Sequence, residues 1–539
     1  MMKKNKLIYT LGLAVLCGLF SSCYEDLSTG ATSKIGEVVI DTTGVGHVNA
    51  NGILEVAQGG TLSLNPVVTQ TGEASPNLTY EWRLALTSSV FNDEFTVIST
   101  EKNLNAPINK RPGNDPYYLW YVVTDKTTGL QYSISWKLMI TSSAGDGLLV
   151  ADTQDELTSD VSLIRAKCLS SNYNDAVLYK RNGYSSMSGS KMTGLINQLF
   201  YGKVTVSQTE TYRVYTLTDN TMVALDPQTY EVSKPYSKLF LSAPSSSAPK
   251  VIQNGVNDMF YVDGTDIYTI YQGNSANIDQ FGVSINYSKP GSTVAKNIPN
   301  KYMVAFASGS YPIATFYDQT LGKFTSVFGF ANTFSLAGVK GNATALNAYD
   351  PTLLPNMEAI GSGPATNARH LHILKDKTTN DIAFYTMESG YDAVTGSYTQ
   401  SVSKFTTASC PDIASAFGFE TCENRDVVYY ATPSAVYGAF ISGTSASGTA
   451  RFTPPSGEKV TCIKLFREAW YLLNTTDETK TAMAENSNQL LVATYNSSTK
   501  EGKIYALPIT NISGALGTPT TDKTFSGFGR ITAMATQGK

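Results

Sequence analysis

The chain has 539 residues, of which 16% are charged, and its formal net charge is −4 at pH 7. This length exceeds one ordinary hydrophobic core, so two or more domains are expected. Tyr outnumbers Phe, 32 to 22, and Gly, Ser and Thr are frequent, a composition typical of β-sheet proteins with many turns. No basic tract of five or more residues occurs, so the charge pattern argues against nucleic-acid binding.

The first 22 residues have the pattern of a secretory signal peptide. A basic head of Lys3, Lys4 and Lys6 precedes an apolar run over residues 7–20, which is too short to span a bilayer as a helix. An N-terminal core helix or a membrane anchor is the alternative, but the basic flank and the short run favour export. Removing residues 1–22 takes away three lysines and no acidic residue, which changes the formal charge from −4 to −7.

The signal region ends in a cysteine that suggests a lipid anchor. The stretch SSC at residues 21–23 resembles the bacterial lipobox, in which the cysteine is acylated and becomes the mature N-terminus. Phe20 departs from that pattern, since an aliphatic residue is usual there, and the alternative is an ordinary signal peptide. The following YED at residues 24–26 resembles the surface-export signal of Bacteroidota lipoproteins, or is a solvated acidic linker. We expect Cys23 to anchor the chain in the outer membrane, facing the cell exterior, with residues 23–33 as linker.

Residues 34–141 predict an immunoglobulin-like sandwich. The stretch LTYEWRLAL at residues 78–86 is a strand with Trp82 in its middle, and residues 117–141 form two strands around a DKTTG loop. YEW and the later VTD…G resemble PKD-type domains, although the cysteine pair of antibody domains is absent. Trp82 is expected in the core; a ligand platform is the alternative reading.

Residues 144–539 contain a recurring hairpin phrase, in which an apolar pair, Asp or Asn and a few polar residues precede another strand. It occurs at residues 147–156, 221–233, 259–270, 313–325, 371–386 and 490–507, and more loosely at 436–452. The average spacing of about 56 residues slightly exceeds the roughly 40 to 50 of a propeller blade. The pattern predicts a β-propeller, with seven blades, and a large β-sandwich or β-solenoid is the alternative.

The full layout resembles the PKD-like family lipoproteins of Bacteroidota. The resemblance rests on the lipobox, the YEW and VTD…G motifs, and the phrase GDGLLVADTQDELTSDVSLI at residues 145–164. GRITAMATQGK at residues 529–539 is expected to close the propeller by joining its first blade. The family resemblance implies an accessory surface role beside SusC/SusD-type nutrient importers, without a defined catalytic site.

The sequence offers few candidates for chemistry. His370 and His372 share one face of a strand and could bind a metal only with a third ligand, so we expect no metal site. No GxSxG, HExxH or GxxxxGK[ST] motif occurs, no cofactor is expected, and Asp263-Gly264 indicates a tight turn. A pair of distant carboxylates converging in a central pocket stays an open alternative.

Four cysteines lie beyond the signal region, Cys168, Cys410, Cys422 and Cys462, and none forms a CxxC pair. Cys410 and Cys422 could form a disulfide after export, or all four could be buried apolar residues.

These observations favour a non-enzymatic surface lipoprotein that captures nutrient, either peptide or glycan, with a SusC/SusD-type importer. A propeller-based glycan hydrolase or lyase is the first alternative, and a protein-binding adhesin or assembly factor is the second. The sequence assigns no ligand-binding residue.

Overall fold

The computed structural model describes residues 36–538, with the exception of 44, 46–51, 59, 72–76, 87–94, 109, 111–115, 142–144, 171–172, 208, 256–257, 272–277, 287–294, 306–313, 331–332, 339–340, 343–346, 393–396 and 469–482. The predicted signal peptide 1–22, the anchor Cys23 and the linker 23–33 lie outside the described residues. The described residues form an all-β protein of two compact units. Unit 1 ends at Ile140 and unit 2 begins at Thr141; residues 57–59 and 109–112 also group with unit 2.

The described residues of unit 1 form nine strands. They are β1 (Val38–Asp41), β2 (Ile53–Ala57), β3 (Thr61–Leu64), β4 (Val67–Gln70), β5 (Leu78–Ala85), β6 (Phe95–Ser99), β7 (Leu104–Pro107), β8 (Tyr117–Asp125) and β9 (Gln131–Thr141). A five-stranded sheet has the order β2-β9-β8-β5-β6, and β1 pairs with β4 and β3 with β7. The predicted hairpin around the DKTTG loop is confirmed by the antiparallel pairing of β8 with β9.

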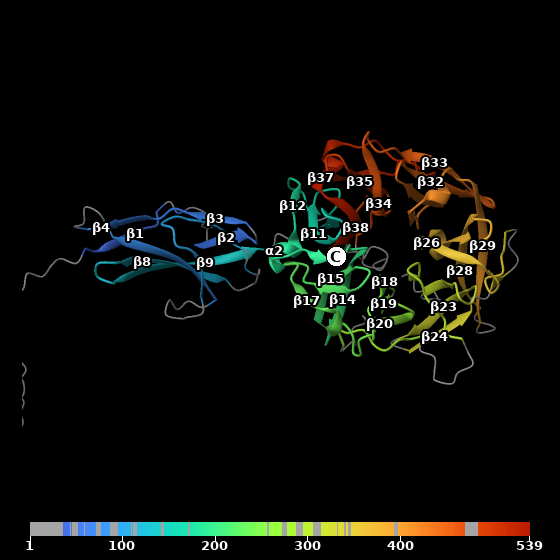
Figure 1. The fold of residues 1–539 in the computed structure, drawn as a ribbon, viewed down its shortest axis with the longest axis horizontal. Coiled ribbons are helices and arrows are strands. Elements are labelled where there is room, and N and C mark those ends of the chain that lie inside the picture. Colours follow the sequence, from blue (N-terminus) through green and yellow to red (C-terminus); the bar gives the residue numbers. More distant parts are fainter. Residues whose placement is uncertain are drawn as a thin grey trace, which may run out of the picture. The chain divides into compact units, whose positions relative to one another are not determined.

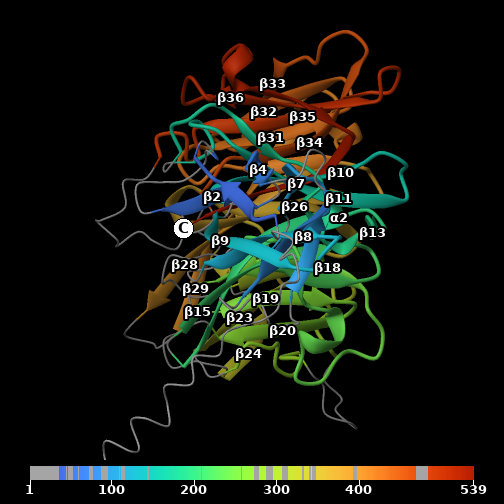
Figure 2. The ribbon, with the colours of Figure 1, turned by 90° about the vertical axis from the view of Figure 1, so that its left-hand side faces the viewer.

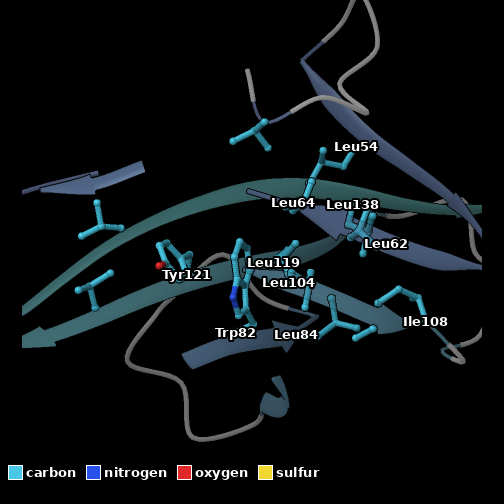
Figure 3. Close-up of a cluster of buried hydrophobic side chains, with 14 of the residues drawn as sticks. Leu54, Leu62, Leu64, Trp82, Leu84, Leu104, Ile108, Leu119, Tyr121 and Leu138 are labelled. Carbon is cyan, nitrogen blue, oxygen red and sulfur yellow. The ribbon is translucent and has the colours of Figure 1, made fainter. Parts of the chain in front are cut away.

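Trp82 lies in the core of unit 1, as its position in an alternating strand predicts. Its side chain is fully buried, its ring centroid lies 4.3 Å from that of Tyr121, and its Nε1 donates to the carbonyl of Glu101 at 3.0 Å. Figure 3 shows Trp82 among the buried leucines of the facing strands. The indole therefore contributes packing and has its polar atom satisfied, which excludes the ligand-platform reading.

Unit 2 begins with four sheets in chain order. Sheet 1 contains β10 (Gly147–Thr153), β11 (Thr158–Arg165), β12 (Leu178–Lys180) and the last strand of the chain, β38 (Arg530–Gln537), and β13 (Met192–Thr193) pairs with β11. Sheet 2 contains β14 (Gln198–Val206), β15 (Thr209–Leu217), β16 (Met222–Leu225) and β17 (Val232–Lys234). Sheet 3 contains β18 (Pro249–Asn254), β19 (Asp258–Asp263) and β20 (Asp266–Tyr271). Sheet 4 contains β21 (Val304–Ala305), β22 (Ala314–Asp318), β23 (Lys323–Phe330) and β24 (Thr333–Gly338).

Three further groups of four strands follow, and the first two of them belong to one continuous nine-stranded sheet, whose halves we number as sheets 5 and 6. Sheet 5 contains β26 (Met357–Ala365), β27 (Arg369–Asp376), β28 (Ile382–Asp392) and β29 (Ser397–Ser409), with β25 (Gly341–Asn342) beside β29. Sheet 6 contains β30 (Gly418–Thr421), β31 (Val427–Thr432), β32 (Ala435–Ser442) and β33 (Ser445–Phe452), and parallel pairing of β29 with β33 joins it to sheet 5. Sheet 7 contains β34 (Glu458–Leu465), β35 (Gln489–Asn496), β36 (Glu501–Pro508) and β37 (Thr524–Phe528).

Helical structure in the described residues is limited to short turns. They are α2 (Gly183–Ser188), η1 (Tyr236–Lys238), η2 (Thr366–Ala368), η3 (Ile413–Ser415) and η4 (Thr521–Lys523). No helix among the described residues is long and apolar enough to cross a membrane.

Consecutive sheets of unit 2 contact one another through their first strands. These contacts run β38–β14–β18–β21–β26–β30–β34 and return from β34 to β38. Figure 1 shows the sheets following one another in chain order, from teal through green and yellow to red, and Figure 2 shows the same strands after a turn of 90°. Each small sheet has two apolar faces, and stacking on its two neighbours removes both from water.

A separate apolar cluster fills each interface between neighbouring sheets. The last of these clusters joins the end of the chain to its beginning, because Leu491 and Ile504 of sheet 7 pack with Leu148 and Ile531 of sheet 1. All four side chains are fully buried. The seam where the two ends of unit 2 meet is therefore filled by a buried apolar cluster, as the other interfaces are.

The C-terminal strand confirms the predicted closure. β38 pairs antiparallel with β10 from Gly147↔Gln537 to Thr153↔Arg530, with one bulge beside Asp152. The first strand of sheet 1 thus comes from the opposite end of the chain to its other strands.

The predicted hairpin phrases lie one in each of the seven sheets, and four of them share one turn. The first residue, Asp226, Asp318, Asp376 or Asn496, accepts backbone N–H groups two and three positions later at 2.7 to 3.3 Å. The fifth residue, Tyr230, Gly322, Asn380 or Lys500, has a left-handed backbone with φ between 58° and 63°. The short side chain of the Asp or Asn closes this turn, which explains why the phrase contains one of these two residues.

Candidate functional site

A cavity of about 300 Å³ lies where the first strands of the sheets of unit 2 meet. Every one of these first strands contributes to its wall; one residue from each is Gln198 (β14), Gln253 (β18), Val304 (β21), Gly363 (β26), Glu420 (β30), Lys464 (β34) and Thr536 (β38). Residues immediately after β34, up to Glu468, complete the lining.

The two-residue period of a strand divides the side chains of β14 between its two neighbouring interfaces. Leu199 and Tyr201 are buried in the apolar cluster between sheets 1 and 2, whereas Phe200 packs against the cluster between sheets 2 and 3 and is partly exposed. Successive side chains of a strand point to opposite sides. Residues of both sets, together with Gln198, line the cavity where the strand borders it.

Two glutamines of the cavity wall bind the neighbouring strand through both atoms of their amides. Gln198 donates to the carbonyl of Ile252 at 2.8 Å and accepts from its N–H at 3.0 Å. Gln253 in the same way donates to the carbonyl of Met303 at 2.5 Å and accepts from the N–H of Ala305 at 2.9 Å. These amides connect β14 to β18 and β18 to β21. Because they bond to the backbone of the neighbouring strand, they stabilise the wall of the cavity.

The opposite part of the wall uses other side chains for the same purpose. Thr421 donates to the carbonyl of Pro364 at 2.6 Å, Arg467 to that of Thr421 at 2.7 Å, and Thr536 to that of Arg467 at 2.5 Å. A Cβ on Gly363 would lie 2.3 Å from Oγ1 of Thr421, so only glycine leaves room for the threonine. The bonds connect β26, β30, β34 and β38 in succession.

A cluster of four charged residues occupies this part of the wall. Arg467 donates to Oε2 of Glu423 through Nε at 3.0 Å and Nη2 at 2.7 Å, and Ser487 donates to the other oxygen of Glu423. Glu420 lies 3.4 Å from Nζ of Lys464 and 3.9 Å from Nη1 of Arg467. Arg467 is thus fixed by Glu423, while Glu420 and Lys464 make longer contacts.

Burial and charge act in opposite directions on Arg467. Burial by itself lowers the pKa of the guanidinium, but the adjacent carboxylates of Glu423 and Glu420 outweigh it and raise that pKa above its ordinary value. Arg467 therefore stays charged under all relevant conditions, and Glu423 serves as its structural counter-ion.

A second glutamate of the lining, Glu468, is held at the edge of this cluster. Its Oε2 accepts from Nδ2 of Asn486 at 2.8 Å, and its backbone N–H donates to Oδ1 of the same asparagine at 2.7 Å. Two acids, Glu420 and Glu468, consequently line one cavity together with Lys464 and Arg467. The cavity can offer hydrogen-bond acceptors, donors and charges of both signs to a ligand.

His370 and His372 lie away from this cavity. Both rings are buried between sheets 4 and 5, where Oγ1 of Thr315 bonds to Nδ1 of His370 at 2.7 Å and to Nε2 of His372 at 2.9 Å. Burial lowers the pKa of His370 to about 4 and, with the neighbouring His370, that of His372 to about 3. Within the part of the chain that the structure describes, no group of three His, Cys, Asp or Glu side chains could hold a metal ion.

The possible disulfide between Cys410 and Cys422 is absent from the structure, in which both residues are free thiols. Cys410 is buried in the cluster between sheets 5 and 6, whereas Cys422 is buried in the cluster between sheets 6 and 7. Because the two side chains point into different interfaces, they serve as small apolar residues, which was the other reading of the sequence.

Residues 23–195 match the family model described as "PKD-like family", which is about a third of the chain. The match extends past unit 1 and includes β10 to β13 of sheet 1. The chain therefore contains a PKD-like segment, as the YEW and VTD…G motifs predict. No curated protein matches the chain.

Similar solved structures include AztD from Citrobacter koseri, at 9% identity over 86% of this chain and 99% of that chain, with a TM-score of 0.33. The N-terminal domain of Nup159 is 8% identical over 71% of this chain and 85% of that one, with a TM-score of 0.30. PorZ, a surface component of the type-IX secretion system of Porphyromonas gingivalis, is 10% identical over 76% of this chain and 63% of that one, with a TM-score of 0.27. Scores of this size do not establish a shared fold.

Proposed function

We propose that unit 2 is a seven-bladed β-propeller and that the whole chain is a non-enzymatic surface lipoprotein, which binds nutrient for a SusC/SusD-type importer. The closed series of contacts between first strands supports the propeller, and so does the pairing of β38 with β10. Sheets arranged radially leave only short edges and surround a central cavity, which is where propellers usually bind their ligands.

One observation carries the binding function: all seven first strands line a single cavity that contains acids, bases and an aromatic ring. A concave site with a few convergent polar groups is sufficient for ligand binding. No histidine or cysteine lines it among the described residues, so a Ser–His or Cys–His nucleophile pair has no members there.

A glycan hydrolase or lyase is the second candidate, because Glu420 and Glu468 line the same cavity. Glycoside hydrolysis needs one carboxylic acid that carries a proton, usually in an apolar environment. Glu420 instead lies between Lys464 and Arg467. This arrangement suits a carboxylate that accepts hydrogen bonds better than it suits a proton donor.

The surface location and the importer partner rest on the lipobox at Cys23 and the family resemblance. A pull-down of the tagged chain from native outer membranes tests both. We expect a SusC/SusD-type pair to co-purify with the wild-type chain and to be absent when Cys23→Ala is used. If the wild-type chain is recovered without any importer protein in a comparable amount, the importer association is rejected.

A further inference from the structure

The charged part of the cavity wall brings opposite charges close together. Glu420 lies 3.4 Å from Lys464 and 3.9 Å from Arg467, and the side chains of Glu420 and Arg467 are only 14% and 15% exposed. Charges so poorly hydrated interact strongly with any charge brought near them. An anionic ligand at this wall would meet Glu420, and a cationic ligand would meet Lys464 and Arg467. The lining holds two acids, Glu420 and Glu468, and two bases, Lys464 and Arg467, so the wall gives no net attraction to a ligand of either charge.

Glu420 and Lys464 retain hydrogen-bonding capacity. A carboxylate can accept about four hydrogen bonds, and a good N⁺–H···O⁻ bond is about 2.7–2.9 Å long. Both contacts of Glu420 to described residues are longer than this. Lys464 has three donors, and its side chain is 42% exposed, so it can turn toward a ligand. The pair offers acceptors and donors side by side.

The rest of the wall is less polar than its composition suggests. Gln198 and Gln253 use their amides on the neighbouring backbone, so they shape the cavity. Phe200, also in the lining on β14, packs against the apolar cluster between sheets 2 and 3 and is partly exposed. The exposed part of its ring offers an apolar contact that does not require charge.

We infer that the cavity binds a neutral saccharide of one or two rings, with adjacent hydroxyl groups that donate to Glu420 and accept from Lys464. This inference rests on the proposed binding function and names its ligand class. Adjacent hydroxyls combine a donor and an acceptor at the spacing that a mixed acid–base pair provides. The cavity volume of about 300 Å³ is at the small end of the roughly 300–1,000 Å³ typical of ligand sites, which favours a short ligand over a long chain.

The test is a calorimetric titration of the folded chain without its lipid anchor. The titrants are neutral mono- and disaccharides, uronic acids, amino sugars and dipeptides. We expect a neutral saccharide to bind, and Glu420→Gln and Lys464→Met each to weaken that binding by about tenfold or more, the usual effect of removing a hydrogen bond to a charged group. Glu358→Gln and Lys459→Met are matched controls, because both residues are exposed on first strands and outside the cavity lining. Thermal unfolding of each variant verifies that it is folded.

The outcomes separate the ligand class from the binding function. If dipeptides or charged sugars bind in the cavity and neutral saccharides do not, the ligand class is wrong while the proposed function stands. If a neutral saccharide binds but neither cavity variant weakens it more than its control does, the assignment to Glu420 and Lys464 is wrong. If no titrant binds, both the inference and the proposed function in nutrient capture are rejected.

Discussion

The backbone N–H of Gly529 donates to Oδ2 of Asp152 at 2.7 Å, although 377 residues separate the two in the sequence. A Cβ on Gly529 would lie 2.1 Å from the carbonyl of Thr153, so glycine is required where the last strand begins. The first and last strands of unit 2 meet at this contact. Sheet 1 is consequently incomplete until the whole chain has been made.

Removal of β38 should unfold unit 2. Ile531→Ala is the mildest form of this test, because Ile531 is fully buried in the cluster between sheets 7 and 1. We expect it to reduce the free energy of unfolding by about 2–5 kcal/mol, measured by chemical denaturation. Thr532→Ala on the same strand should cost much less, since Thr532 is only partly buried and its hydroxyl makes one 3.4 Å bond. Equal losses in the two variants would argue against β38 as the closing strand.

The recurring turn should prefer glycine at its fifth position. Lys500 is exposed and has φ of 58°, a conformation that costs a residue with a Cβ about 1 kcal/mol relative to glycine. Ser497 lies in the same turn with an ordinary negative φ, so Ser497→Gly is the matched control. We expect Lys500→Gly to be about 1 kcal/mol more stable than Ser497→Gly in thermal unfolding. Equal destabilisation by both substitutions would show that the left-handed residue carries no strain.

Asp258 should contribute less to the stability of unit 2 as the pH rises from about 4 to about 7, whereas the buried His370 and His372, whose pKa is lowered, act in the opposite direction. Burial raises the pKa of this carboxyl to about 7, and Oδ1 has no hydrogen-bond partner among the described residues. The folded state therefore holds the proton over a pH range in which the unfolded state has lost it, and its stabilising effect is lost as the pH rises through the folded pKa. Each pKa unit corresponds to about 1.4 kcal/mol. Asp258→Asn should therefore gain stability relative to the wild type between pH 4 and pH 7, read from denaturation of both proteins at several pH values. A difference between the two that does not change with pH would contradict this role of Asp258.

The four cysteines beyond the signal region should all be free and slow to react. Burial raises the pKa of Cys410 to about 11 and that of Cys422 to about 12, and thiolates are the reactive form. We expect alkylation followed by mass spectrometry to modify these thiols only after unfolding, without prior reduction. Recovery of a peptide pair linked through Cys410 and Cys422 would contradict the separation of these side chains into two interfaces.

The anchor prediction depends on residues outside the described structure and is tested in cells. Cys23→Ala should move the chain from the membrane to the soluble fraction and abolish palmitate labelling, because the acylated residue is gone. Sensitivity of processing to globomycin should disappear in the same variant. Cys17→Ala, within the signal peptide, is the control and should leave labelling intact. Continued labelling of Cys23→Ala would refute the anchor.

Local patterns in the sequence predicted the parts of the fold that depend on neighbouring residues. Trp82 lies in an alternating strand and is buried, and Asp376 lies in a polar turn between apolar strands and closes it. The closing strand was also predictable, because residues 529–539 follow the last repeated hairpin and a ring of sheets is closed by joining the first one. Its partner β10 was expected because it belongs to the first of the repeated hairpins.

The charged cluster could not be predicted, because its members come from different sheets. Glu420 and Lys464 are 44 residues apart and lie on strands with no distinctive motif. Alternation along β30 shows that every second side chain faces the same way, but it does not show which way faces a cavity. Gly363 gave a weak signal in the sequence, since a glycine in a strand often marks a close approach of another group.

The central claim is that the cavity of unit 2 binds its ligand without converting it. Ser362 lies in the cavity wall on β26, so Ser362→Trp should fill the space, while Glu358→Trp on the same strand adds the same ring outside it. The decisive measurement is equilibrium binding of the neutral saccharide panel to the wild type and both variants, with each mixture then analysed by mass spectrometry. We expect saturable binding that is lost only in Ser362→Trp, with the saccharide recovered intact. Binding that survives in Ser362→Trp, or a cleaved product that disappears in Glu420→Gln, would contradict this account.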